Sequence, residues 1–378
     1  MYITRHLDFS TRLSNKSYFL FGPRQTGKTS LIHHSLQNYR YYNLLKTDVY
    51  LKLSREPQRL RKEISDKDHI VIIDEIQKLP FLLDEVHNLI EQKKIHFLLT
   101  GSSARKLRNK GVNLLGGRAR IRRLHPFSCV ELKEHFQLKT ALERGLIPSI
   151  YFSDAPFEDL ETYTGTYLKE EIAAEAVVRN VPAFSRFLTV AGLCNGKILN
   201  YSNIASDAQV PRSTVQEYFQ ILRDTLLGDD LPAWRKSVKR KPLSTAKFFF
   251  FDVGIARYLQ GRREMTRRSP EFGEAFEAYI YHELKTYCDY KGGHDLCYWR
   301  STSGVEVDFI LDGKTAIEVK GKSHITRRDF GGLNAIREEG LLKTYILVSL
   351  EDTPWREGDI HILPWKDFVV RLWRDAFV

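Results

Sequence analysis

The sequence predicts an α/β protein of several domains, and three observations support this prediction. Short apolar runs alternate with amphipathic stretches through the first 150 residues, charge-rich short helices fill the middle, and strands and helices alternate after about residue 271. A chain of 378 residues is long enough for two or three domains. The changes of pattern place these domains at 1–150, 151–265 and 266–378.

The composition is that of a globular chain with excess positive charge. Lys and Arg number 58 against 47 Asp and Glu, a formal net charge of +11. Such a surface attracts polyanions, although ordinary solubility charge explains it equally well. No apolar run approaches the roughly 20 residues that span a bilayer, so we expect a cytoplasmic protein without a membrane partner. The four cysteines form no C-x-x-C pair and are expected to be reduced thiols.

The first domain is predicted to hold a parallel sheet with a phosphate-binding loop. Apolar runs at 17–21, 70–73 and 95–100 lack polar alternation, as in strands covered on both faces. Residues 22–29 follow the first run and read GxxxxGK[ST], between a strand and a helix. The backbone N–H groups of such a loop point at phosphate oxygens, and the start of the helix adds partial positive charge. The alternative is a structural loop.

This loop predicts a site for ATP and Mg²⁺. Lys28 would reach the β and γ phosphates, and Thr29 would be a ligand of Mg²⁺. The predicted nucleotide-binding residues are Gly22, Pro23, Arg24, Gln25, Thr26, Gly27, Lys28, Thr29 and Ser30, joined by Ser102 as explained below.

Two carboxylates follow the second apolar run. Asp74 and Glu75 would stand at the carboxyl edge of the sheet, where open α/β sheets bind ligands. Asp74 suits the Mg²⁺ shell, and Glu75 suits polarising the attacking water. Taken alone, the same pattern would describe a capped strand end.

Two weaker candidates complete this site. The third run ends in Thr100-Gly101-Ser102, where a hydroxyl could sense the γ-phosphate or merely cap the next helix. Arg118 follows two glycines and could present its guanidinium to a phosphate of its own or of a neighbouring subunit, which would imply a homo-oligomer. A basic surface stretch is the alternative for Arg118.

The middle segment predicts a helix-turn-helix with a wing. In residues 198–222, Val215, Phe219 and Leu222 share one face of the second helix, with Ser213 and Thr214 as candidate caps. The exposed start of such a helix usually reads base edges. A basic stretch follows and precedes an aromatic strand at 248–251; its cations, which could contact phosphates, are Arg235, Lys236, Lys239, Arg240, Lys241 and Lys247. We therefore expect nucleic acid, most plausibly DNA, as a partner, with packing or subunit contact as the alternative.

A β-hairpin is predicted at residues 304–320, and its register can be argued. A two-residue turn at Asp312-Gly313 would put Asp308 and Glu318 on opposite faces. A three-residue loop at 312–314 pairs Leu311 with Thr315 and Phe309 with Ile317. Its continuation pairs Val307 with Val319, which gives one apolar face and sets Asp308 opposite Glu318 on the other. Burial of the apolar face favours this second register.

The favoured register predicts a metal site. Asp308 and Glu318 could share Mg²⁺ or Mn²⁺ through oxygen ligands, and Glu277 on a preceding helix could add a carboxylate. Lys320 could orient water or stabilise charge on a phosphorane. A hairpin with Glu and Lys on its solvated face is the plain alternative.

The chain resembles a known family at these positions. The loop at 22–29, the strand ending in Asp74-Glu75, Thr100-Gly101-Ser102 and Gly117-Arg118 are similar to the P-loop AAA-type ATPase domain of a bacterial and archaeal group of ATPases. In that group the ATPase is fused to a C-terminal region of unknown function that includes a restriction-endonuclease-like fold. The Asp-loop-Glu-x-Lys pattern of Asp308, Glu318 and Lys320 resembles the PD-(D/E)xK nuclease core. Residues 42–46 depart from the Asn-Leu-Asp-Asp pattern of the family.

The resemblance implies a P-loop AAA-type ATPase domain, then a winged helix-turn-helix, then an α/β restriction-endonuclease-like domain. It implies a Mg²⁺-dependent ATPase acting on nucleic acid, with a metal-dependent nuclease-like domain. In this interpretation the catalytic residues are Glu75, Arg118, Asp308, Glu318 and Lys320. One alternative is an ATP-driven switch whose C-terminal domain only binds DNA or protein. Another is a scaffold that binds nucleotide without turnover.

Overall fold

The computed structural model describes residues 2–103, 115–167, 180–267 and 269–378. They form two compact units, which we describe separately. Unit 1 consists of Met1–Pro126 with Asp224–Leu227, and unit 2 of Phe127–Arg223 with Gly228–Val378.

Unit 1 is built on a parallel five-stranded sheet of order β2-β3-β4-β1-β5. The three predicted strands are confirmed as β1, β3 and β4, and strands β2 and β5 at the sheet edges were not predicted. The elements are β1 (Ser17–Phe21), α1 (Lys28–Ser35), β2 (Tyr39–Asn43), α2 (Thr47–Arg55), α3 (Arg59–Glu63), β3 (Ile70–Asp74), η1 (Ile76–Lys78), α4 (Leu82–Lys93), β4 (His96–Gly101), η2 (Leu115–Gly117) and β5 (Ala119–Arg123).

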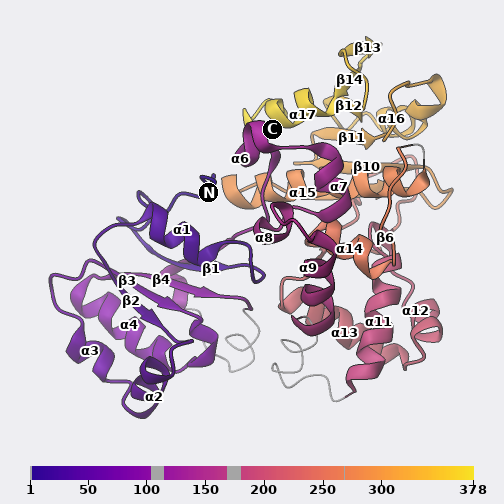
Figure 1. Ribbon diagram of the computed structural model, residues 1–378. Coiled ribbons are helices and arrows are strands. Elements are labelled where there is room, and N and C mark those ends of the chain that lie inside the picture. Colours follow the sequence, from indigo (N-terminus) through magenta and orange to yellow (C-terminus); the bar gives the residue numbers. More distant parts are fainter. Residues whose placement is uncertain (1, 104–114, 168–179, 268) are drawn as a thin grey trace. The chain divides into compact units, whose positions relative to one another are not determined.

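Alternate strand residues of this sheet form its main core. Phe19, Ile73 and Leu99 pack in one buried cluster with residues of α2, α3 and α4, whereas α1 lies on the other side of the sheet (Figure 1). Both faces are therefore covered, as the unbroken apolar runs predict. The carboxyl ends of β1, β3 and β4 meet at one edge.

Unit 1 ends earlier than the boundary we placed at residue 150. Residues after Pro126 pack instead on helix α15 of unit 2. The Cys129 N–H donates to Glu283 Oε1 at 2.7 Å, and the ring of Phe136 lies 5.5 Å from that of Tyr279. Partners so distant in sequence leave no local signal for this boundary.

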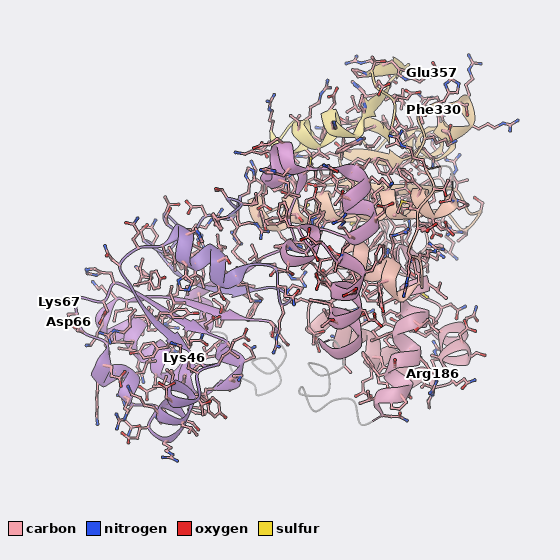
Figure 2. The ribbon with its side chains drawn as sticks, in the orientation of Figure 1. Lys46, Asp66, Lys67, Arg186, Phe330 and Glu357 are labelled. Atoms are coloured by element: carbon pink, nitrogen blue, oxygen red, sulfur yellow. The ribbon has the colours of Figure 1, made fainter. Side chains whose placement is uncertain are left out.

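The first half of unit 2 is helical with a small antiparallel sheet of order β6-β8-β7. Arg186 of α11 donates to the carbonyl of Ala208 at the end of α12 (3.3 Å; Figure 2). The elements are α6 (Cys129–Leu132), η3 (Lys133–His135), α7 (Leu138–Arg144), α8 (Pro148–Tyr151), α9 (Pro156–Thr162), η4 (Tyr163–Tyr167), α11 (Val181–Leu193), β6 (Lys197–Ile198), α12 (Tyr201–Ala208), α13 (Arg212–Asp224), β7 (Gly228–Leu231), β8 (Lys247–Phe250) and α14 (Val253–Leu259).

Helix α13 has the predicted amphipathic face. Val215, Phe219 and Leu222 are buried, while Arg212, Ser213 and Gln216 are exposed and Thr214 is half-buried. The helix begins at Arg212, before the residues we predicted as caps.

Residues 232–246, which we call the strap, connect β7 to β8 and include most of the predicted wing. The Trp234 side chain is buried in the core of the C-terminal sheet, and the backbone N–H of Trp234 donates to the Tyr298 carbonyl at 2.7 Å. Two of the predicted phosphate contacts are engaged within the protein: Arg240 pairs with Glu338 at 2.5 Å, and Lys247, just after the strap, is only 4% exposed. Packing of the strap thus engages these two predicted phosphate contacts with protein groups.

The second half of unit 2 holds a six-stranded mixed sheet of order β13-β14-β12-β11-β10-β9. Its elements are α15 (Pro270–Lys291), β9 (Leu296–Arg300), β10 (Glu306–Leu311), β11 (Thr315–Val319), η5 (Arg327–Phe330), α16 (Gly331–Arg337), β12 (Thr344–Ser349), β13 (Trp355–Glu357), β14 (Ile360–Pro364) and α17 (Trp365–Trp373).

The hairpin of β10 and β11 has the favoured register but not its regular continuation. Leu311 pairs with Thr315 and Phe309 with Ile317, as predicted, and Gly313 takes a left-handed conformation (φ 60°). The register against β9 shifts between Val307 and Ile310, so these two residues join one cluster although they are three apart. The pairing of Val307 with Val319 is replaced, because the Val319 N–H donates to Asp308 Oδ2 at 2.7 Å.

Two further expectations concern the whole chain. All four cysteines are free thiols, as predicted. Within the described residues, no helix is long and apolar enough to cross a membrane.

Candidate functional site

The phosphate-binding loop of unit 1 joins β1 to α1. Helix α1 begins at Lys28, directly after Gly27 with a φ of 93°. The Lys28 ammonium donates to the carbonyls of Gly22 and Pro23 at 2.7 and 3.0 Å. Arg24, Gln25, Thr29 and Ser30 are exposed, whereas Thr26 is buried. The loop is therefore closed on itself by the lysine that the pattern assigns to phosphates.

An arginine that we did not predict holds this loop from behind. The buried Arg5 guanidinium donates to the Thr26 carbonyl at 2.7 Å and to the His125 carbonyl at 2.6 Å. These bonds tie the loop to the chain just after β5. Arg5 has no motif around it, so only the fold could find it.

The two carboxylates of unit 1 are buried at the end of β3. Asp74 accepts hydrogen bonds from the Thr100 hydroxyl and, at 2.6 Å, from the Tyr41 hydroxyl. Burial and this bond raise the pKa of Tyr41 above its ordinary value. Thr100 and Tyr41 come from the neighbouring strands β4 and β2, so the sheet itself fixes the orientation of Asp74.

Glu75 is held by a residue that the sequence did not single out. Its backbone is left-handed (φ 62°), and the Gln77 amide donates to Glu75 Oε2 and, at 3.3 Å, to Ser102 Oγ. Glu75, Gln77 and Ser102 are all buried. The Gly22 N–H donates to the Gly101 carbonyl at 3.2 Å, so this group borders the phosphate-binding loop.

Arg118 pairs with a residue outside this group. Its guanidinium forms an ion pair with Glu91 of α4, and both side chains are partly exposed. A phosphate contact by Arg118 stays a prediction.

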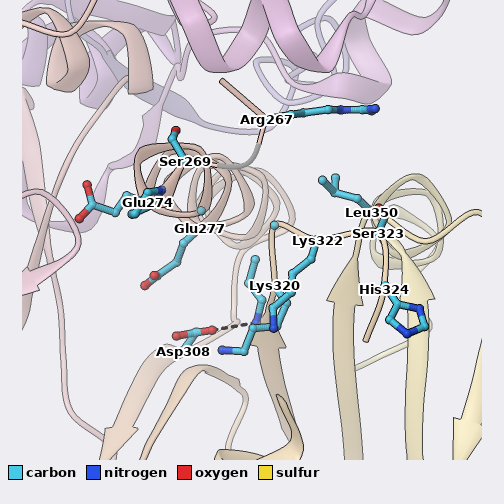
Figure 3. Close-up of a pocket in the computed structure, with 14 residues that line it drawn as sticks. Arg267, Ser269, Glu274, Glu277, Asp308, Lys320, Lys322, Ser323, His324 and Leu350 are labelled. Atoms are coloured by element: carbon cyan, nitrogen blue, oxygen red, sulfur yellow. Dashed lines mark hydrogen bonds between the residues drawn. The ribbon is translucent and has the colours of Figure 1, made fainter. Parts of the chain in front are cut away.

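Two of the predicted carboxylates of unit 2, Glu277 and Asp308, line a pocket of about 850 Å³. Glu277 points from α15 toward Asp308 of β10, and Lys320, directly after β11, lines the same pocket (Figure 3). Arg267, Lys322 and His324 add basic groups to the same wall. The pocket is thus lined by carboxylates and by basic side chains.

Two lysines pair with the carboxylates. Lys320 Nζ lies 2.5 Å from Glu318 Oε1. Lys247 Nζ lies 3.1 Å from Glu277 Oε1 and also contacts Glu306. We call Glu277, Glu306, Asp308 and Glu318 the acidic cluster.

The acidic cluster is short of positive charge despite these lysines. Burial and the neighbouring Asp308 raise the pKa of Glu277 to about 7 and the pKa of Glu318 well above its ordinary value. Burial alone would lower the pKa of Lys247, but the carboxylates of Glu277, Asp308 and Glu306 raise it. Carboxylates with raised pKa values are those that an added cation would stabilise most.

The residues of unit 2 fit a hard divalent cation in their chemistry. Glu318 is 6% exposed, and its Oε2 has no hydrogen-bond partner among the described residues. Carboxylate oxygen is the ligand that Mg²⁺ and Mn²⁺ prefer. Across the described ranges, however, no three acidic, His or Cys side chains already stand in a metal-holding group. The cation would therefore have to draw the carboxylates together.

Three family models match successive segments of the chain. Residues 14–133 match the model of the AAA domain. Residues 135–266 and 272–368 match two models described as domains of unknown function, DUF8612 and DUF4143. Over residues 14–133, unit 1 is therefore similar to the AAA domain.

The chain is also similar to curated and solved proteins. Uncharacterized proteins of Mycobacterium tuberculosis and Mycobacterium bovis are each 23% identical over 304 residues, which cover 78% of this chain and 67% of theirs. One from Methanocaldococcus jannaschii is 22% identical over 413 residues, covering 93% and 84%.

Two solved structures match at low TM-scores. They are the Aeropyrum pernix ORC1 protein in complex with DNA (14% identity, TM-score 0.26, covering 65% of this chain and 86% of that one) and the replication initiator DnaA bound to AMPPCP and single-stranded DNA (16%, 0.28, 55% and 82%). Scores this low carry no argument about this chain.

Proposed function

We propose that unit 1 binds and hydrolyses ATP with Mg²⁺. The observation that carries this proposal is the buried pair Asp74 and Glu75, each oriented by hydrogen bonds, beside a loop with the phosphate-binding pattern. A capped strand end needs no such support on both carboxylates.

Each residue has a separate role in this proposal. Lys28 leaves the Gly22 and Pro23 carbonyls and binds the β and γ phosphates, and the backbone N–H groups that follow Pro23 in the loop surround them. Mg²⁺, held by Thr29 and Asp74, offsets phosphate charge when bound. Glu75 orients the attacking water and accepts its proton, while Ser102 and Arg118 are candidates for contact with the γ-phosphate.

Substitution of Glu75 tests the proposal. Glu75→Gln keeps the size of the side chain and its bond to Gln77 but removes the base, so turnover should fall by about 10²–10⁴ while ATP affinity stays. ATPase assays and ATP binding measured on the same preparations check this, with Lys28→Ala as the variant that loses binding. Unchanged turnover in Glu75→Gln would overturn the assignment of the base.

A second candidate function, action on nucleic acid, concerns unit 2. We propose that α11 to β8 form a winged helix, which the order α11-β6-α12-α13-β7-β8 and the antiparallel sheet support. We propose further that residues 266–378 are a PD-(D/E)xK nuclease-like domain that acts on a phosphodiester, most plausibly of DNA. The mixed sheet, the hairpin register and the buried Glu318 Oε2 without a partner among the described residues favour it.

The residues of this second site would have separate roles in metal binding and in the reaction. Asp308 and Glu318 would hold Mg²⁺ or Mn²⁺, with Glu277 as a further carboxylate; the cation would supply positive charge at the scissile phosphate. Lys320 would orient water or offset phosphorane charge. The competing proposal is an ATP-driven switch whose pocket binds DNA or protein without cutting.

Arg118 of unit 1 would contact the nucleotide of a neighbouring subunit only in a homo-oligomer.

A further inference from the structure

Lys247 is a buried lysine whose ammonium reaches the acidic cluster from outside the C-terminal sheet. It is the first residue of β8, whose backbone pairs with Ile198 of β6 and Leu231 of β7. Its Nζ contacts Glu306 and lies 3.1 Å from Glu277 Oε1. The same Nζ lies 5.4 Å from the centre of the Tyr298 ring. Because the backbone of Lys247 pairs with a strand on each side, the position from which its side chain reaches the carboxylates is fixed.

The two lysines pair with different carboxylates of the acidic cluster, which therefore has two halves. Lys320 serves Glu318 at one end. Lys247 serves Glu277 and Glu306 at the other, where Arg300 adds a contact to Glu306 at 3.2 Å. Only the first half has a carboxylate oxygen that is buried and without a hydrogen-bond partner among the described residues, Glu318 Oε2. The second half already holds a cation between its two carboxylates.

We propose that the Lys247 ammonium occupies the place of a divalent cation between Glu277 and Glu306, so that the acidic cluster takes a single metal ion, at Asp308 and Glu318. The inference rests on the metal site of the proposed function and deepens it. An ammonium donates to two carboxylates much as a cation bridges them, but it carries one charge and cannot bring water to a phosphate. Lys247 is thus a specificity residue that sets the number of ions.

The surroundings of Lys247 allow an ion to replace it. A second pocket of about 410 Å³ is lined by Lys247, Glu277, Glu306 and Arg300 among others. An ion could therefore reach these carboxylates from solvent once the ammonium is removed. Removing the lysine alone leaves two carboxylates facing each other, which is costly in a buried site unless a cation returns.

Mn²⁺ binding to the full chain without nucleotide tests the inference. Equilibrium titrations followed by the electron paramagnetic resonance of free Mn²⁺ count the ions bound to each variant. We expect Lys247→Met to bind one more ion per chain than the wild type, and Lys247→Arg to bind the wild-type number. Glu318→Gln should bind one fewer than the wild type.

A matched control exists on the same helix as Glu277. Lys291 also pairs with a carboxylate, Asp375 at 2.9 Å, and lies 6.0 Å from the centre of a tyrosine ring, but at the surface. Lys291→Met should leave the ion count unchanged. If Lys247→Met folds only with Mn²⁺, the double variant Lys247→Met/Glu306→Gln restores the charge balance and should return to the wild-type count.

The outcomes separate this inference from the proposed function. No extra ion in Lys247→Met, with a Glu318-dependent ion in the wild type, overturns the inference and keeps the metal site. A wild type that already binds two ions in the acidic cluster also overturns the inference and keeps the metal site. Without any Glu318-dependent ion the metal site of the proposed function fails. In that case the inference of a single ion at Asp308 and Glu318 is overturned as well, whatever number of ions Lys247→Met binds.

Discussion

At the scale of single residues, the orientation of Glu75 depends on a glycine that it does not touch. Gln77 bonds both Glu75 and Ser102, and Gly101 lies against Gln77. A Cβ at Gly101 would stand 2.3 Å from Gln77 Oε1. That atom is the end of a flexible side chain, so an added methyl would displace the amide and not the backbone. The effect should be on catalysis more than on stability.

Gly101→Ala is therefore expected to lower kcat for ATP by between about tenfold and a hundredfold, because the carboxylate of Glu75 loses its support. ATP affinity and melting temperature should stay close to wild type. Gly331→Ala is the control, because a Cβ there meets nothing within 4 Å and its φ is −53°. A Gly101→Ala enzyme with wild-type kcat would show that Gln77 does not position Glu75.

At the scale of elements, the hairpin shows what a sequence pattern can and cannot predict. The register of β10 and β11 follows from burial of Phe309 and Ile317, which only one loop length allows. The shift beside Asp308 depends on pairing with β9, a strand outside the pattern. The residues of the site were therefore predictable, but the contact of Asp308 with the Val319 N–H was not.

The strap carries basic residues that we predicted as phosphate contacts, and one carboxylate binds its backbone. Glu339 accepts from the backbone N–H groups of Val238 and Lys239, both at 2.7 Å, and of Arg240 at 3.1 Å. Its side chain is fully buried. Charge counts along a sequence cannot show that a distant glutamate binds the backbone of a basic segment.

Glu339→Ala should lower the free energy of unfolding by about 2–4 kcal/mol, because three N–H groups lose a charged acceptor. Urea denaturation measures this. The neighbouring Glu338, which is 60% exposed and pairs with Arg240, supplies the control, and Glu338→Ala should unfold close to wild type. Equal effects of the two substitutions would mean that the strap is not held by these hydrogen bonds.

The same carboxylate predicts a dependence of stability on pH. Burial alone would raise the pKa of Glu339, but the N–H groups of Lys239 and Val238 hold it below the ordinary value of 4.5. A depressed pKa stabilises the fold above 4.5 and loses that contribution as the pH falls further, through the folded-state pKa. The stability difference between the wild type and Glu339→Ala should therefore shrink below pH 4.5.

At the scale of the whole molecule, local patterns predicted both sites but not how the chain is divided. The loop at 22–29 and the hairpin carry their chemistry within short spans, so the sequence shows them. Arg5, Tyr41 and Gln77 bond residues that are 120, 33 and 25 positions away, and none of the three lies in a predicted motif. Lys247 was predicted only as a phosphate contact, and its contact with Glu306 was not. The early end of unit 1 at Pro126 has the same cause, since partners on α15 determine it.

Cleavage of DNA is the prediction that needs the whole chain. With Mg²⁺ or Mn²⁺, the wild type should cut linear or circular DNA, and Glu318→Ala should lose at least about a hundredfold in rate because the metal charge at the phosphate is lost. Glu357→Ala is the control, since Glu357 is half-exposed on β13 (Figure 2). Adding ATP to wild type and to Glu75→Gln separates the units: equal cleavage in all four conditions means that the nucleotide cycle does not govern the pocket. No cleavage of any DNA would favour the non-cutting switch, in which the raised pKa values of Glu277 and Glu318 reflect a binding surface instead of a reaction centre.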